Sequence, residues 1–100
     1  MSVVMSMRWA GATPEQYDAA RQRVRWEEQP PPGIVLHEAW FEDDGMHVID
    51  VWESQADWDR FLTEQIMPAV KDIGMPGEPE YHISPLHRRF VSPGVSGSGT

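Results

Sequence analysis

The fold is decided by residues 48–61, which read VIDVWESQADWDRF. Up to Trp52 the apolar residues alternate with a period of two, as in a strand, and after Ser54 they recur at helical spacing. Ser54 is a natural N-cap, and Asp57 stands three residues later, where it can complete a capping box. This stretch therefore predicts a strand that passes into a capped helix with almost no loop.

The length of the chain allows one domain with a small core. It has 100 residues, of which 40% are hydrophobic, and these include five Trp and three Phe. We expect residues 1–91 to form the domain and residues 92–100, which are rich in Ser and Gly, to be a flexible tail. A domain of this size often leaves one apolar sheet face uncovered, so we expect a second copy of the chain to cover it.

The composition excludes several classes of partner. Sixteen Asp and Glu residues against eight Lys and Arg give a net charge of −8, which repels nucleic acids and anionic membranes. The chain has no Cys, so disulfides, thiolate catalysis and Cys-ligated metals are excluded, and a cytoplasmic location is expected. No apolar stretch is long enough to span a bilayer, and residues 1–9 do not resemble a signal peptide.

Local signals define the other elements. Residues 13–16, Thr-Pro-Glu-Gln, combine an N-cap, a proline at N1 and a capping-box Gln, and Tyr17, Ala20 and Val24 follow at helical spacing. Residues 42–45 form a tight acidic turn, which predicts a hairpin. The predicted order is strand 2–9, helix 14–26, strand 34–41, strand 46–53, helix 55–73 and strand 80–84, with a continuation of the last strand through Phe90.

The order β-α-β-β-α-β predicts an α+β, ferredoxin-like fold. In that fold right-handed crossovers place both helices on one face of a four-stranded antiparallel sheet. Pro68 interrupts the apolar stripe of the second helix, so we expect a kink or a separate last turn there, and Gly74 is a plausible C′ residue. Large apolar groups also point to the other face of the sheet, where the second subunit is expected to pack.

Four features of the chain point to a known family: the order of its elements, Val-Trp-Glu-Ser at 51–54, the aromatic pair Trp58 and Phe61, and Pro68 late in the second helix. They resemble the dimeric α+β barrel superfamily and, within it, the antibiotic-biosynthesis-monooxygenase (ABM-like) domains, over residues 2 to about 90. That superfamily includes cofactor-free quinone-forming oxygenases, polyketide cyclases, heme-degrading enzymes and muconolactone-type isomerases. The resemblance implies a homodimer with a pocket between sheet and helices in each subunit, and it implies no single reaction.

Counting along the predicted hairpin places a histidine beside an acid. If Phe41 and Met46 are partners across the turn, His37 lies opposite Asp50 on the same face. A buried carboxylate that accepts from one imidazole nitrogen would orient His37 and raise its basicity. The other nitrogen could then take a proton from an acidic phenol or from a carbon next to a carbonyl. We therefore predict His37 and Asp50 as catalytic residues.

Aromatic side chains complete the predicted pocket. The same count places Val35 opposite Trp52, so Trp52 shares the face of His37 and can stack on a planar substrate. His82 can join either face of the sheet. The predicted substrate-binding residues are Trp52, Trp40, Phe61 and His82.

Each of these residues also has a structural interpretation. His37 and Asp50 can simply satisfy each other in a half-buried sheet or lie at the dimer interface. His87, beside two arginines, resembles a solvated cluster or a dimer contact. The count places Glu38, Trp40 and His47 on the other face. Surface or interface roles are favoured for Glu38 and His47. No spacing of His, Asp or Glu predicts a metal site.

Two functional hypotheses follow, and neither requires a cofactor. Heme-degrading relatives carry a Trp near the place of Phe61 and an axial His where this chain has Lys71, so the resemblance argues against heme. The first hypothesis is a small cofactor-independent monooxygenase or cyclase that acts on an aromatic or polyketide-like molecule. The second is a non-catalytic homodimeric module that binds an apolar small molecule or a protein partner. A cavity that is open to solvent and lined by His37 and Asp50 would favour the enzyme.

Overall fold

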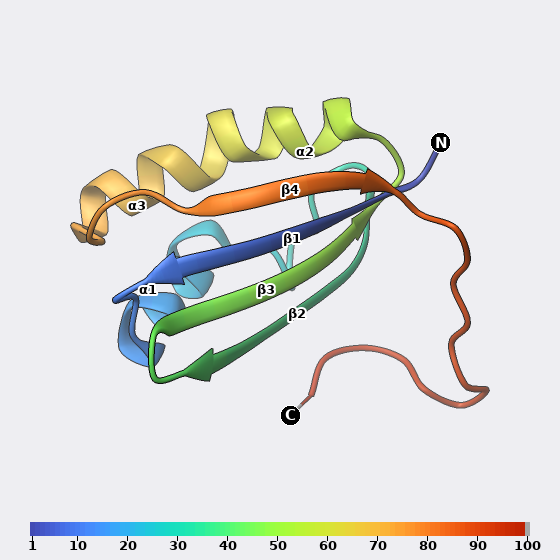
Figure 1. The fold of residues 1–100 in the computed structure, drawn as a ribbon, viewed down its shortest axis with the longest axis horizontal. Helices are drawn as coiled ribbons and strands as arrows, with labels where there is room; N and C mark the ends of the chain where they lie inside the picture. The colour runs from blue at the N-terminus through green and yellow to red at the C-terminus, as the bar shows by residue number, and fades with distance from the viewer. Residues whose placement is uncertain (100) are drawn as a thin grey trace.

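Four strands form one antiparallel sheet, and the helices form a second layer against one of its faces (Figure 1). The structure is a computed structural model and describes residues 1–99. The strands are β1 (Val3–Ala10), β2 (Ile34–Glu42), β3 (Gly45–Trp52) and β4 (Glu80–Pro85). The helices are α1 (Pro14–Val24), α2 (Gln55–Phe61), the π-helical segment η1 (Leu62–Ile66) and α3 (Met67–Ile73).

The strand order is β2-β3-β1-β4, and every neighbouring pair is antiparallel. The two strands that are adjacent in the sequence, β2 and β3, form the hairpin, and each of the other two connections carries helix. This is the predicted α+β, ferredoxin-like arrangement, and the fold class is confirmed. Strand β2 is an edge of the sheet, so a side chain on it can lie between the buried core and the solvent.

The first helix begins as predicted and ends earlier. Thr13 accepts from the backbone N–H of Gln16, while the Gln16 side chain accepts from the backbone N–H of Thr13, which completes the capping box. Arg25 takes a left-handed backbone conformation with φ of 63°, which ends α1 at Val24 instead of Trp26. Trp26 therefore begins the following turn, and its side-chain direction is not set by the spacing of the helix.

The hairpin register agrees with the prediction near the turn and departs from it at the far end. Phe41 pairs with Met46, and His37 pairs with Asp50. A bulge between positions 34 and 36 then shifts the register, so Trp52 pairs with Ile34. The predicted pairing of Trp52 with Val35 is wrong because of this bulge.

Helix α2 follows β3 after a two-residue link, as the sequence predicts. The Ser54 side chain accepts from the backbone N–H of Asp57, which caps the helix. The Asp57 carboxylate accepts from the Ser54 hydroxyl at 2.8 Å and from Arg60 at 3.0 Å. The predicted capping box is therefore replaced by a side-chain pair, because the carboxylate bonds the hydroxyl and not the Ser54 backbone. These two bonds hold the pKa of Asp57 below its ordinary value.

Pro68 divides the long second helix, although not by a simple kink. A proline has no N–H and its ring crowds the carbonyl four residues earlier, so the regular α pattern cannot pass through it. The preceding turn widens to the π-helix η1, in which the N–H of Met67 donates to the carbonyl of Leu62. The α-helix resumes as α3 and ends at Gly74, whose φ of 80° is the predicted left-handed cap.

The chain after β4 has no helix or strand in the described residues. The predicted continuation of the last strand through Phe90 is wrong, because pairing with β1 ends at Pro85. Residues 92–99 are exposed and follow a curved path away from the sheet, with a turn in which the N–H of Val95 donates to the carbonyl of Ser92, and position 100 of the predicted tail lies outside the described residues (Figure 1). None of the described helices has the length and apolar character needed to cross a bilayer.

The core lies between the sheet and the helices. Trp52, Trp58 and Met5 are its largest fully buried side chains, and Trp52 contacts both Trp58 and Phe61 across the two layers. In residues 1–99 the one buried residue that is polar or charged is Asp50. A carboxylate at this depth requires partners, and those partners define the site below.

Candidate functional site

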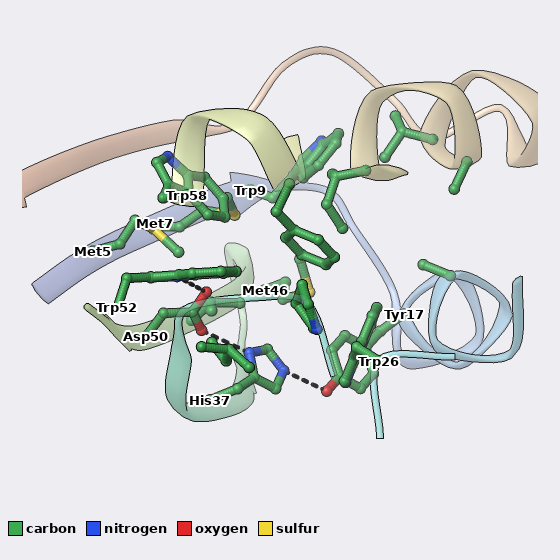
Figure 2. A pocket seen from close by; sticks show the side chains of 18 of the residues that line it. Met5, Met7, Trp9, Tyr17, Trp26, His37, Met46, Asp50, Trp52 and Trp58 are labelled. Carbon is green, nitrogen blue, oxygen red and sulfur yellow. Dashed lines mark hydrogen bonds and ion pairs between the residues drawn. The ribbon is translucent and has the colours of Figure 1, made fainter. Parts of the chain in front are cut away.

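Three side chains from three elements form a continuous hydrogen-bonded chain (Figure 2). The Asp50 Oδ1 atom lies 2.7 Å from His37 Nδ1, and His37 Nε2 lies 2.7 Å from the Tyr17 hydroxyl. Asp50 comes from β3, His37 from the edge strand β2 and Tyr17 from α1. The predicted neighbours His37 and Asp50 are therefore in contact, and the structure adds Tyr17 to them.

Asp50 is held by donors on both of its oxygens. It is 4% exposed, and its second oxygen, Oδ2, accepts from the indole N–H of Trp52 at 3.1 Å. Asp50 and Trp52 are two residues apart in β3, so both side chains point to the helix layer. Two charge-assisted hydrogen bonds fix the direction of the carboxylate.

The partners of His37 determine which ring nitrogen carries the proton. An ionised carboxylate only accepts, so Nδ1 donates to Asp50. In the neutral ring Nε2 then has a lone pair, and it accepts from the Tyr17 hydroxyl. The His37 side chain keeps 24% of its exposure, so solvent still reaches the ring. The arrangement is that of a general base, oriented from behind by an acid.

Tyr17 is held in its neutral form. Burial, and after it the Glu27 carboxylate, raises the pKa of Tyr17 to about 12; Arg21 opposes this shift, and Asp50 adds to it. The phenol ring also lies parallel to the His37 ring at 5.9 Å between centroids. At neutral pH the hydroxyl therefore keeps its proton and donates a hydrogen bond to His37 Nε2.

A cavity adjoins this chain between the sheet and the helices. Its volume is about 90 Å³, it is partly open to solvent, and Tyr17, His37 and Asp50 lie in its wall. Most of the remaining wall is apolar and aromatic. Four methionines contribute to it, Met5, Met7, Met46 and Met75, together with Trp9, Trp26, Trp52, Trp58 and Phe61.

The volume limits what the cavity holds without rearrangement. It is smaller than the cavity of about 150 Å³ that binds benzene in an engineered protein. A ring enters only if side chains of the wall move. Methionine is unbranched and adapts its shape at low cost, so the four methionines give the wall this freedom.

Two indole N–H groups of the wall have no hydrogen-bond partner within residues 1–99. They belong to Trp26 and Trp58, and both nitrogens are buried. An unpaired buried donor costs about 1–3 kcal/mol, so native proteins rarely keep one without a reason. Trp26 lies 5.4 Å from His37 and 5.6 Å from Tyr17 between ring centroids, which places it beside the hydrogen-bonded chain (Figure 2).

The predicted substrate-binding residues divide between the two faces of the sheet. Trp52 and Phe61 line the cavity, as predicted. Trp40 is 40% exposed on the opposite face, where it donates to Glu42. His82 pairs with Ser6 of β1 and shares that opposite face. The assignment of Trp40 and His82 to the pocket is wrong, because alternation along β2 and β4 turns both side chains away from the helices.

Tyr17 and Trp26 are site residues that the sequence pattern does not predict. The spacing of Tyr17 with Ala20 and Val24 indicates that it faces the sheet, so the pattern already predicted a core position for it. Contact with His37 depends on how α1 docks on β2, and no local pattern encodes that. Trp26 lies beyond the helix end, where the left-handed Arg25 turns its ring toward the site.

A second cluster of polar groups lies at the β2–β3 turn. The side chains of Glu42, Asp44 and His47 bring three potential metal ligands within 4.8 Å of one another. His47 already contacts Asp44 at 2.8 Å, and Arg8 pairs with the same carboxylate. Trp40 donates to Glu42. These groups satisfy one another on the surface, so the cluster needs no metal to explain it.

Known proteins resemble this chain in structure and not in sequence. No protein-family model matches this sequence, and no curated protein matches it in sequence. Solved structures do match: the chain has the fold of several structures described as putative antibiotic biosynthesis monooxygenases, as the resemblance implied.

Three solved structures illustrate the match. SnoaB, a cofactor-independent oxygenase from Streptomyces nogalater, is 18% identical, with 91% of this chain and 96% of that chain covered and a TM-score of 0.59. The protein NE2512 of Nitrosomonas europaea, of unknown function, is 15% identical over 93% and 95% of the chains, with a TM-score of 0.62. A monooxygenase from the gene ActVA-Orf6 of Streptomyces coelicolor, solved with Nanaomycin D, is 14% identical over 91% of both chains, with a TM-score of 0.54. At these identities the likeness establishes the fold alone.

Proposed function

We propose that this protein is a cofactor-independent oxygenase that removes a proton from a neutral aromatic or polyketide-like substrate and lets the resulting anion react with O₂. The observation that carries the proposal is the chain Asp50–His37–Tyr17, which reaches an apolar cavity that is partly open to solvent. The name of SnoaB, a cofactor-independent oxygenase of the same fold, supports the same reaction class.

The chemistry balances without a bound redox group. His37 accepts a proton from the substrate and becomes an imidazolium, which the Asp50 carboxylate stabilises. The electron-rich anion reduces O₂, and a CH₂ group next to the ring becomes a carbonyl while the second oxygen atom leaves as water. The substrate supplies all four electrons. In the absence of O₂ the same anion can attack a carbonyl of its own chain, which is the cyclase form of the reaction.

The cavity wall selects the charge of the substrate. Among the described residues that line it there is no Lys or Arg, and the one acidic residue is the buried Asp50. A carboxylate or a phosphate would lose its hydration there without gaining a cation. The substrate therefore enters neutral, and any charge formed in the reaction is balanced by the imidazolium.

The test is turnover of a panel of neutral phenols and anthrone-like ketones, followed by O₂ uptake in air and by product formation without O₂. We expect O₂ uptake by the wild type and a loss of roughly 10²- to 10⁴-fold in His37→Ala, because a positioned base contributes that much. His87→Ala is the matched control, since His87 is exposed and lies beyond the last strand. Undiminished turnover by a folded His37→Ala protein would contradict the proposal.

One observation favours the second hypothesis, a binding module without catalysis. Both nitrogens of His37 have hydrogen-bond partners within the protein, so the polar chain is satisfied by its own side chains. If the panel binds with unchanged affinity to wild type and to His37→Ala, and no substrate is consumed, the cavity serves binding alone.

A further inference from the structure

Tyr17 and Trp26 contact each other and both contact the His37 ring. Tyr17 lies on α1 and Trp26 in the turn that follows it, and both rings are within 6 Å of the His37 ring between centroids. Tyr17 already bonds Nε2 of His37, whereas the indole N–H of Trp26 is buried and unpaired. One residue thus offers an oxygen with unused acceptor capacity, and the other offers an unused donor.

We propose that Tyr17 and Trp26 form the binding site for one hydroxyl oxygen of the substrate, which makes the ligand a neutral phenol or enol. This inference rests on the proposed function, because it names the functional group that the same site recognises. The substrate hydroxyl donates to the Tyr17 oxygen and accepts from the Trp26 N–H.

The two hydrogen bonds of His37 are the reason for placing the substrate hydroxyl at Tyr17. Nδ1 donates to Asp50, and Nε2 is covered by the Tyr17 hydroxyl, so a substrate proton cannot reach the imidazole directly. It reaches the imidazole through Tyr17. The substrate O–H bond breaks and its proton moves to the Tyr17 oxygen, while the former Tyr17 proton moves to Nε2. The products are a substrate oxyanion, a neutral Tyr17 and an imidazolium paired with Asp50.

The relay agrees with the chemistry of a buried phenol. Tyr17 holds its proton strongly, with a pKa raised to about 12, so a mechanism through a free tyrosinate is disfavoured. In the relay Tyr17 receives one proton as it gives up another and never carries a full negative charge. His37 then acts through Tyr17, and Tyr17 is the residue that touches the substrate.

Trp26 supplies what the relay lacks, which is a donor for the oxyanion. Its N–H is buried and has no partner in residues 1–99, so a ligand oxygen that reaches it gains an otherwise unpaired donor. Preorganised donors of this kind stabilise charge that develops during a reaction. Trp58 also has an unpaired N–H, but its ring packs among Trp52, Phe61 and Tyr81 and not against His37.

The five tryptophans provide a direct readout by NMR of their indole N–H groups. Three of these groups have partners in the protein and serve as internal controls: Trp9 with Pro76, Trp40 with Glu42 and Trp52 with Asp50. The probes are p-cresol and toluene, which differ by one hydroxyl and, as single rings, require the least movement of the cavity wall. Their spectra differ by the hydrogen bond, because ring-current effects are common to both.

We expect p-cresol, and not toluene, to shift the Trp26 indole proton to higher frequency, and to bind more tightly than toluene. Tyr17→Phe and Trp26→Phe should each weaken p-cresol binding relative to toluene binding by roughly 2- to 10-fold, because a change in the shape of the wall affects both probes and the lost hydrogen bond affects p-cresol alone. Trp40→Phe is the control on the opposite face, and it should change neither. Equal shifts of Trp26 with both probes, or equal losses for both probes in the two variants, would overturn the inference. Because the readout is binding, it stands even if no substrate is turned over.

Discussion

Asp50 is a carboxylate in the middle of an otherwise apolar strand face, and its two bonds set the direction of every hydrogen bond in the site. Trp52 donates to one oxygen and His37 to the other, so His37 must present an acceptor to Tyr17. A change of one atom at position 50 would therefore be transmitted through the ring to the tyrosine.

Asp50→Asn tests this dependence. The amide oxygen can still accept from Trp52, but the NH₂ group then donates to His37 Nδ1, which moves the ring proton to Nε2. We expect the ¹⁵N spectrum of His37 to show the reversed tautomer, and kcat to fall by roughly 10²- to 10⁴-fold. An unchanged tautomer with normal activity would show that Asp50 does not orient the base.

The pH dependence of stability tests the burial of Tyr17. The pKa of Tyr17 is raised from 10.0 to about 12 in the folded protein. Between these values the folded chain keeps a proton that the unfolded chain has lost. The contribution of Tyr17 to the free energy of unfolding is therefore fully present below about pH 10 and is lost as the pH rises toward about 12. Urea unfolding near pH 9 and near pH 11 should show that the free energy of unfolding falls more between these two pH values in wild type than in Tyr17→Phe.

Tyr81→Phe is the matched control, because the chain has two tyrosines. Tyr81 is 38% exposed and contacts Trp58 away from the hydrogen-bonded chain. This variant should keep the steep loss of the wild type. If Tyr17→Phe loses stability as steeply as wild type does, the phenol is not buried in the way the structure indicates.

Individual site residues could be predicted from the sequence only where the pairing of two strands alone fixes their positions. Counting by two from the Phe41–Met46 pair brings His37 opposite Asp50, because a tight turn fixes the register. The count fails at Trp52, where the bulge lies, and cannot reach Tyr17. That contact depends on the packing of a helix on a sheet, which is a tertiary property.

Among the elements, the loop before β2 is positioned by one close approach. Gly33 has φ of 91°, its carbonyl accepts from the N–H of Glu53, and a Cβ there would lie 2.3 Å from an Asp57 carboxylate oxygen and 2.6 Å from the Asp57 Cβ. The clash reaches the base of the Asp57 side chain, so rotation of its tip does not relieve it. Any side chain at position 33 therefore disturbs the cap of α2.

Gly33→Ala and Gly74→Ala form a matched pair that separates this clash from backbone strain. Both glycines have positive φ, and an added Cβ at Gly74 meets nothing within 4 Å. We expect Gly74→Ala to lower the free energy of unfolding by about 1 kcal/mol and Gly33→Ala by about 2–4 kcal/mol, since overpacking adds to strain. Urea unfolding of the two variants measures the difference. Equal losses would show that the approach of the loop to Asp57 is not tight.

Elements with strong local signals were predictable, and interruptions were not. Thr13 and Ser54 mark the helix starts because capping is a local interaction. Pro68 marks an irregular turn, yet whether the chain kinks or widens to a π-helix depends on how the apolar stripe must meet the sheet. The π-helix keeps Ile66 in the cavity wall across the interruption.

For the whole molecule, the face of the sheet opposite the helices is incomplete. An apolar strip of partly exposed side chains runs along its centre, with Ile49 on β3 and Val4 on β1, and the helices pack against the other face. Polar residues surround this strip. A second copy of the chain that packs sheet against sheet would bury the strip, which is the homodimer that the sequence predicts.

Ile49→Lys tests the predicted dimer. A lysine in the centre of such an interface would be buried without a partner, so we expect the dissociation constant of the dimer to rise by roughly 100-fold or more. Sedimentation velocity over a range of concentrations measures it. Gln22→Lys is the control, because it adds the same charge to the exposed side of α1. A wild type that stays monomeric at high concentration would contradict the dimer itself. A dimer that tolerates Ile49→Lys as well as Gln22→Lys would instead place the interface away from the open face, and leave the apolar strip to another partner.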